Sequence, residues 1–229
     1  MIKKKVVKKY HKNEDKLISG HNGFIYPLVN SLMNILKKIN LVEGFKYISK
    51  LLASKTGSRE TQLKYSRIAV DLFITFKWLF IFWILLAGIN KIWIVIIVWY
   101  LLFTNLYTYF YYHTWSTEIL IDVKFNVDRI KRRFTNLIQA ISFSLFGFTY
   151  LYFIPYSSEF YWVDDQPVFI QSLWFSILNS LTASYEQVKP ISNLGNTIAN
   201  IQLIMMFVFL SIIIGGSVPQ LINSKEKEG

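Results

Sequence analysis

The chain has 229 residues, no cysteine and a formal net charge of +11. Hydrophobic residues make up 53% of the sequence and the mean hydropathy is +0.33, whereas a soluble domain is about 45 to 50% apolar. These values exclude a disulfide framework, a cysteine zinc site and a thiol nucleophile. Because the apolar excess lies in a few runs, they predict an all-α integral membrane protein.

The basic residues are concentrated before the first apolar run. Fifteen of the 25 Lys and Arg residues precede Asp71, a placement typical of a cytoplasmic segment that faces the membrane. Residues 1–69 are therefore predicted to be a basic cytoplasmic or interfacial helical region. We expect its partners to be anionic lipid headgroups, and we expect no nucleic acid.

Within this region, apolar residues recur at helical spacing between residues 28 and 52. The spacing predicts one or two amphipathic helices, with lysines largely off the apolar stripe. Two interpretations stay open: helices lying on an anionic inner leaflet, or a helical hairpin packed under the transmembrane part or on a neighbouring subunit. Residues 54–59 are predicted to form a loop.

Two long apolar runs, over residues 72–89 and 92–112, predict a transmembrane hairpin within residues 70–112, joined by Asn90 and Lys91. Lys77 lies inside the first run. A charge within a span is by default a functional-site hypothesis. A lysine near the start of a helix can also snorkel back to water, and this is the interpretation we favour from the sequence.

Residues 113–135 are polar and predict a cytoplasmic loop by the positive-inside rule. Its basic side chains hold the loop inside, or bind anionic headgroups or an RNA. They are Lys124, Arg129, Lys131, Arg132 and Arg133.

The region 136–216 predicts a third span over 136–154, a short helix over 167–181, an extended loop, and a fourth span over 196–216. The short helix carries five polar side chains and has too few residues to cross a hydrocarbon core, which needs about 20 apolar residues. A re-entrant helix is therefore predicted. The N-terminus and a tail over 217–229 are then cytoplasmic, together with 22 of the 25 basic residues.

The loop after the short helix carries a resemblance to a known family. Residues 182–190 read Thr-Ala-Ser-Tyr-Glu-Gln-Val-Lys-Pro, which resembles the Thr-Val-Gly-Tyr-Gly-Asp-x-x-Pro filter of the tetrameric potassium-channel superfamily, where carbonyl rings replace the hydration shell of an ion. The matching positions are Thr182, Tyr185, Pro190, Gly195 and the aromatic pair Trp174 and Phe175. The resemblance implies a pore helix, a filter loop and an inner helix, with four chains around one pore.

The departures from that pattern affect selectivity. Both filter glycines are replaced, by Ser184 and Glu186, and Gln187 stands where the family usually has aspartate. Glycine occupies such positions because alternate residues adopt backbone angles that are costly for a side chain. We therefore do not expect the standard potassium-coordinating backbone, and potassium selectivity does not carry over.

The predicted ion path has three parts. The ion filter comprises Thr182, Ala183, Ser184, Tyr185 and Glu186; the acidic outer mouth comprises Glu159, Asp164 and Asp165; the pore-lining face comprises Thr197, Asn200, Ile204, Val208, Ser211 and Gly215. In a tetramer the Glu186 carboxylates would form a ring, which selects cations over anions by charge.

Each part also has a structural interpretation. Glu186 can be a solvated loop charge that pairs with Lys189, and Asp164 or Asp165 can cap the short helix. The small and polar groups of the last span can serve helix contacts. Glycines 215 and 216 are either a hinge or an ordinary helix end.

No HExxH, GxSxG, P-loop or GxGxxG pattern is present, so we expect neither an enzyme, a cofactor nor a metal site beyond permeant monovalent or divalent cations. The sequence predicts a potassium-channel-like cation channel of altered or weak potassium selectivity, a homotetramer and multi-pass protein of the plasma membrane. The alternative is a non-conducting membrane sensor or scaffold with a channel-like fold, whose basic cytoplasmic regions bind a partner or anionic lipid.

Overall fold

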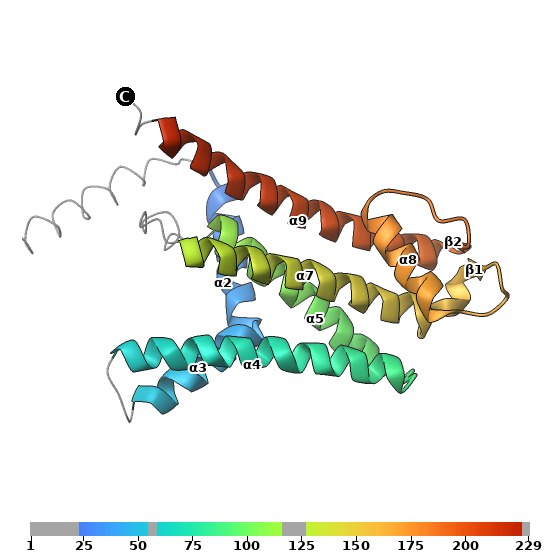
Figure 1. Cartoon of the computed structure of the whole chain (residues 1–229), viewed down its shortest axis with the longest axis horizontal. Coiled ribbons are helices and arrows are strands. Elements are labelled where there is room, and N and C mark those ends of the chain that lie inside the picture. Colours follow the sequence, from blue (N-terminus) through green and yellow to red (C-terminus); the bar gives the residue numbers. More distant parts are fainter. Residues whose placement is uncertain (1–22, 55–58, 116–126, 226–229) are drawn as a thin grey trace, which may run out of the picture. The chain divides into compact units, whose positions relative to one another are not determined.

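The structure is a computed structural model, and it describes residues 23–54, 59–115 and 127–225 (Figure 1). The lysines of the first 22 residues, Lys124 and residues 55–58 of the predicted loop lie outside these ranges. The described elements are mainly helices. In chain order they are α2 (Ile25–Ile39), α3 (Leu41–Ser54), α4 (Arg59–Leu86), α5 (Ile92–Phe110), the π-helix η1 (Tyr111–Trp115), α7 (Val127–Phe153), the 3₁₀ turn η2 (Ser157–Glu159), β1 (Phe160–Trp162), α8 (Phe169–Ser180), β2 (Val188–Pro190) and α9 (Asn193–Lys225).

The chain divides into two units, residues 1–39 and 40–229. In the described part of the first unit, α2 forms where the sequence predicts an amphipathic helix, and Lys37 and Lys38 lie in its last turn. Basic side chains at this position favour the helix because they face its partial negative end. The second predicted amphipathic helix is α3, which belongs to the second unit.

Among the residues that the structure describes, four helices are long and apolar enough to cross a membrane, as predicted. Their spans are Ile68–Leu86, Ile92–Phe110, Phe134–Phe153 and Asn193–Ile213. The first span starts earlier than the predicted residue 72, because α4 continues without a break from Arg59. A short turn with Gly88 at φ 61° joins α4 to α5, and the left-handed backbone there suits a residue without a side chain.

In the second unit, α5 packs against both α7 and α9, α4 packs against α7, and α3 packs on α4 (Figure 1). The common core contains fully buried Ile84, Val98 and Phe148. At the crossing of α5 and α7, a side chain on Gly147 would place its Cβ atom 2.7 Å from Leu102 Cδ2. Small residues allow such close approach, and packing rather than hydrophobic transfer holds helices together inside a membrane.

The predicted cytoplasmic loop over 113–135 is shorter than the sequence suggested. Residues 116–126 lie outside the described ranges, but α7 already begins at Val127, so the basic positions 129–133 are helical. Arginine and lysine are good helix formers. The helix therefore continues from the apolar span through these basic residues. The sequence predicted only the apolar part of α7, over residues 136–154, as a helix.

The last helix is also longer than the predicted span over residues 196–216. α9 runs from Asn193 to Lys225, a length of about 50 Å at 1.5 Å per residue. Glycines 215 and 216 lie within it and do not end it, so their interpretation as a helix end was wrong. A glycine costs only about 1 kcal/mol relative to alanine in a helix interior, less than leaving backbone groups unpaired within a membrane.

Candidate functional site

The two short strands lie together at the end of α7 and the start of α9 (Figure 1). They pair antiparallel, with Phe160 opposite Pro190 and Trp162 opposite Val188. One more bond, from Val163 N–H to the Gln187 carbonyl at 3.1 Å, extends the ladder. The segment between the strands, which includes α8, therefore starts and finishes at the same end of the bundle.

A close backbone contact completes this end of the bundle. Gly195, in the first turn of α9, is buried, and a Cβ atom there would lie 2.5 Å from the Glu159 carbonyl oxygen. The same carbonyl accepts a bond of 3.0 Å from Ile191 N–H. Only glycine fits the start of α9 against this backbone, which explains in physical terms the glycine at this position.

The short helix α8 packs between α7 and α9. Ser176 Oγ donates to the Leu145 carbonyl at 2.9 Å, and Leu145 lies about 12 Å from the end of α7 at 1.5 Å per residue. The carboxyl-terminal half of α8 thus reaches well along the neighbouring helices. Its 12 residues extend about 18 Å, which is shorter than the roughly 30 Å of a hydrocarbon core.

A buried amide joins the three helices. Gln202, with no exposed surface, donates through Nε2 to the Ser176 carbonyl at 2.9 Å and to Ser180 Oγ at 2.9 Å. Its Oε1 atom accepts from Tyr152 at 2.7 Å and from Asn179 Nδ2 at 2.9 Å. We call these five residues the Gln202 cluster. The polar residues that made α8 look unfit to span are therefore largely engaged in holding it in place.

An aromatic group covers this cluster on the side of the strands. The rings of Tyr152, Phe160 and Phe175 lie 4.9 to 5.5 Å apart in edge-to-face arrangements, a geometry that aromatic rings prefer. Of the aromatic pair named in the resemblance, Phe175 belongs to this core, whereas the neighbouring Trp174 is exposed. The two positions thus have different environments in this chain.

Helix α8 ends in a tight cap at Thr182, the first predicted filter residue. Ala183 N–H donates to the Leu178 carbonyl at 2.8 Å and Thr182 N–H to the Asn179 carbonyl at 3.0 Å. This pair of bonds defines a Schellman cap, in which glycine is the usual residue at the left-handed position. Thr182 adopts φ 59° instead, and a left-handed non-glycine residue stores about 1 kcal/mol or more of strain.

The rest of the filter-like loop is mostly exposed. Ala183, Ser184 and Glu186 are exposed, and Tyr185 is half-buried against the core. Within the described residues, positive φ at a non-glycine residue occurs only at Asp165 and Thr182. Ser184 and Glu186, which replace the family glycines, therefore do not adopt the left-handed angles of those glycines, and the loop backbone differs from a potassium filter in this respect.

Glu186 and Lys189 form no ion pair with each other in the described structure, so the predicted pairing was wrong. The strand places Lys189 opposite Tyr161, and the nearby Tyr185 hydroxyl donates to Gln187 rather than to Glu186, at 2.5 Å. The Glu186 carboxylate extends from an exposed turn.

The three predicted outer-mouth carboxylates gather near the strands and the start of α8. Glu159 accepts a hydrogen bond from Ser192 Oγ, and Asp164 accepts one of 2.5 Å from Gln171 Nε2. Asp165 occupies a turn with φ 57°. Neither aspartate is the cap of α8, because the capping position is Val168 and no side chain bonds there. That expectation was wrong.

The predicted pore-lining face of α9 points away from the core of the chain. Thr197, Asn200, Ile204 and Ser211 are exposed and Val208 is half-buried, whereas Ala199, Gln202 and Phe209 face inward. Gly215 lies in the helix, beyond the residues whose side-chain surroundings are described. The structure thus separates a packed face of α9 from an exposed face that carries both polar side chains and large apolar ones such as Phe207.

A second buried polar group surrounds Lys77, which the sequence singled out, and it contradicts the favoured interpretation that this lysine snorkels to water. Lys77 does not snorkel: its side chain is only 7% exposed and its Nζ donates to Asn105 Oδ1 at 2.6 Å. Asn105 in turn donates to the Ala140 carbonyl at 2.9 Å and to Ser144 Oγ at 3.2 Å. Lys77, Asn105 and Ser144, with Phe143 beside the amine, form the Lys77 cluster. The spacing of Phe73, Lys77 and Ile81 by four residues was the available signal.

A scan against protein-family models found no matching family, and searches of curated proteins and of solved structures found no match either. The resemblance to the potassium-channel superfamily therefore stays a prediction.

Proposed function

We propose that the chain forms a cation channel in which α8 is a re-entrant pore helix. Four copies surround one axis, the loop after α8 and the exposed face of α9 line it, and selectivity for potassium is weak. The observation that carries this proposal is the pairing of β1 with β2. It returns the chain to its starting end after a helix too short to cross a membrane.

The position of the end of α8 supports conduction. Ser176, four residues before the end of α8, already lies about 12 Å along α7, which is near the middle of a hydrocarbon core of about 30 Å. A helix directs partial negative charge from its carboxyl end, and this stabilises a cation that has lost part of its hydration shell. The exposed carbonyls of the loop would then lie next to that cation.

The exposed face of α9 supports an assembly around a wet axis. Asn200 is exposed about 10 Å along a helix that can span a membrane. An amide that faces lipid without a hydrogen-bond partner is unfavourable, so this face needs water or another chain. A tetramer with α9 innermost supplies both, since one chain provides only one side of a pore.

The backbone of the loop argues for weak potassium selectivity. Ser184 and Glu186 lack the left-handed angles that aim successive carbonyls at an ion. The exposed Glu186 carboxylates of four chains would instead discriminate by charge. We therefore expect cations to be preferred over anions, with little discrimination between K⁺ and Na⁺.

The test is reconstitution of the full-length protein, with its oligomeric mass verified, in planar bilayers under KCl, NaCl and CaCl₂ gradients. Reversal potentials that follow the cation gradients support the proposal. Silence in all three salts from verified tetramers contradicts it.

Glu186→Gln tests the role assigned to the loop. The side chain is exposed in the isolated chain, so the substitution should leave thermal stability unchanged while it reduces the preference for cations over anions. The matched control is Glu60→Gln, which removes the same charge at the start of α4. An unchanged reversal potential for Glu186→Gln would exclude the carboxylate ring.

A second candidate is a non-conducting membrane sensor or scaffold. The Gln202 cluster favours it, because the polar residues of α8 bond to neighbouring helices and so need no ion to account for them. Its basic cytoplasmic segments, including α2 with Lys37 and Lys38, would bind a partner or anionic lipid. In that case Glu186→Gln leaves binding to vesicles that contain anionic lipid unchanged, and no current is seen.

A further inference from the structure

Lys77 places an amine at the centre of a candidate span. The span runs from Ile68 to Leu86, and the Lys77 amine lies inside the bundle, 2.6 Å from Asn105 Oδ1 and 4.1 Å from the centre of the Phe143 ring. No carboxylate among the described residues pairs with it. A buried charge without a counter-charge is costly, so a negative partner beside the amine would stabilise its protonated form.

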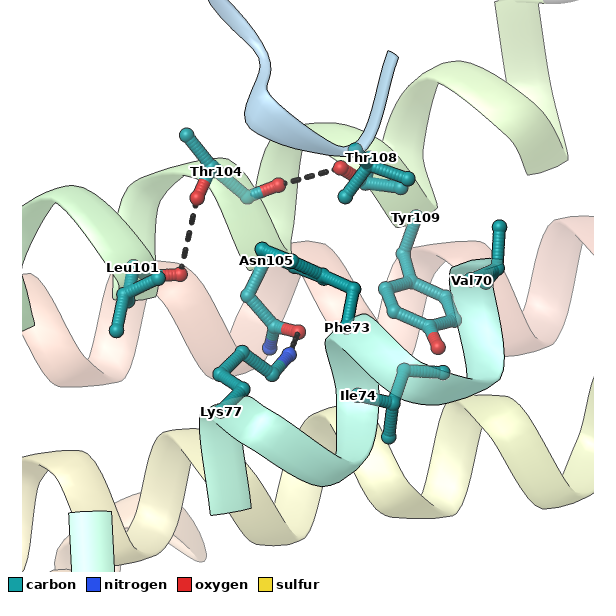
Figure 2. A pocket seen from close by; sticks show the side chains of 10 residues that line it. Val70, Phe73, Ile74, Lys77, Leu101, Thr104, Asn105, Thr108 and Tyr109 are labelled. Carbon is teal, nitrogen blue, oxygen red and sulfur yellow. Dashed lines mark hydrogen bonds between the residues drawn. The ribbon is translucent and has the colours of Figure 1, made fainter. Parts of the chain in front are cut away.

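A cavity of about 50 Å³ lies beside the amine (Figure 2). A buried water needs about 10 to 15 Å³ of such volume, so the space suits a group of about three to five heavy atoms. The lining comes from α4, α5 and the start of α3. It consists of Val42, Val70, Phe73, Ile74, Lys77, Leu101, Thr104, Asn105, Thr108 and Tyr109.

The polar atoms of this lining are largely occupied. Thr104 Oγ1 donates to the Tyr100 carbonyl at 2.8 Å, and Thr108 Oγ1 donates to the Thr104 carbonyl at 2.6 Å. Asn105 uses its oxygen for Lys77 and its nitrogen for α7. An ammonium has three N–H donors, and Asn105 accepts one of them, so Lys77 keeps donor capacity beside the cavity.

This combination favours one class of ligand. Inorganic anions such as sulfate or phosphate are usually held by several donors, and the residues around this cavity offer few beyond Lys77. Half of the lining is apolar, with Val42, Val70 and Ile74 among it. A carboxylate that carries a hydrocarbon chain needs a single cationic partner and has an apolar part that matches the rest of the lining.

We propose that the cavity beside Lys77 binds the carboxylate of a fatty acid or of a smaller organic acid, with the ammonium of Lys77 as its ionic partner. The carboxylate lies between α4 and α5, next to Asn105, and the first carbons of the acid contact the side chains of Val70 and Ile74. The rest of a longer chain lies outside the cavity. The site is separate from the loop after α8, because none of its lining residues belongs to that loop.

The experiment measures thermal unfolding of the full-length protein in detergent with added sodium acetate, sodium dodecanoate or sodium chloride at constant ionic strength. A ligand that binds only the folded state raises the unfolding temperature in a saturable way. We expect this rise with dodecanoate, and also with acetate if a free organic acid is the source. A rise with dodecanoate alone identifies a lipid-derived acid. Chloride should give no rise.

Two variants test the site. Lys77→Met should weaken binding at least tenfold, and Ile74→Trp, which fills the cavity while the lysine stays, should do the same. Ile97→Trp, on an exposed face of α5, is the matched control and should bind like the unaltered protein.

A direct readout is the ¹³Cε signal of labelled lysine, in which the peak lost in Lys77→Met should shift on addition of the acid. The proposal is overturned if no acid gives a saturable rise, if chloride gives an equal one, or if Lys77→Met responds as the unaltered protein does.

Discussion

Two buried polar clusters lie in the same helix bundle, and they differ in how far their polar atoms are satisfied. In the Gln202 cluster, three helices supply donors and acceptors, and the central amide both donates and accepts. In the Lys77 cluster, one amide faces a charged amine beside a cavity. A fully satisfied network makes packing specific, whereas an unbalanced charge costs stability. The two clusters thus differ in how well their polar atoms are paired, although both are buried.

Two substitutions in the Lys77 cluster should change the free energy of unfolding in opposite directions. Among the described residues, Asn105 is the one hydrogen-bond partner of the buried Lys77 amine, so Asn105→Leu should lower the free energy of unfolding by about 3 kcal/mol. Lys77→Met removes the charge itself and should leave stability unchanged or raise it. Unfolding in detergent at matched protein concentration measures both. The double variant should recover most of the loss, and additive losses would contradict the assigned pairing.

Loss of the central amide of the Gln202 cluster should lower the free energy of unfolding. Gln202→Leu takes away the acceptor of Tyr152 and the donor to Ser180. At about 0.6 kcal/mol for each hydrogen bond inside a membrane, we expect a loss of about 2 to 3 kcal/mol. The control is Gln139→Leu, on an exposed position of α7, which should be neutral or stabilising. Equal effects of the two substitutions would show that the cluster contributes nothing.

The close contact at the start of α9 holds that helix against the backbone of Glu159. Gly195→Ala places a Cβ atom against the Glu159 carbonyl oxygen, and the backbone shift should cost about 1 to 3 kcal/mol. Gly44→Ala is matched, because a Cβ atom there meets nothing within 4 Å. A better helix former in α3 should raise stability slightly. A neutral Gly195→Ala would mean that α9 can move away from the strands.

The smallest effect is expected at the end of α8. Thr182→Gly relieves a left-handed residue at φ 59° and should raise stability by about 1 kcal/mol. Ser184→Gly serves for comparison, since Ser184 has no such angle; added chain entropy should make it slightly destabilising. Thermal unfolding distinguishes the two, and a loss of stability in Thr182→Gly would show that the threonine side chain matters more than its backbone.

Hydropathy and length predicted the helices well. The four spans and the short α8 follow from apolar runs and from the shortage of residues between them. Helix ends were less accurate, because charged and glycine residues continue a helix without interrupting its backbone bonds. The three-residue strands were not predicted: Phe-Tyr-Trp and Val-Lys-Pro are too short for an alternating pattern.

The buried clusters depended on contacts that sequence spacing does not reveal. Gln202 meets Tyr152 across fifty positions of the chain, and no local pattern indicates that pairing. Lys77 was expected to reach water because the first span was counted from residue 72. Since the span begins at Ile68 and the helix at Arg59, the lysine lies near the middle of the span, too far inside for its side chain to reach the interface.

The pairing of β1 with β2 allows the amino-acid sequence between the two strands to vary. Main-chain bonds tie residues 160–162 to 188–190, and these bonds do not depend on which side chains lie between them. Substitutions in the exposed turn after Thr182 can therefore change charge, size and hydration there while α7 and α9 keep their anchor. The surface chemistry of this loop can therefore change through a few exposed side chains, without a change of fold.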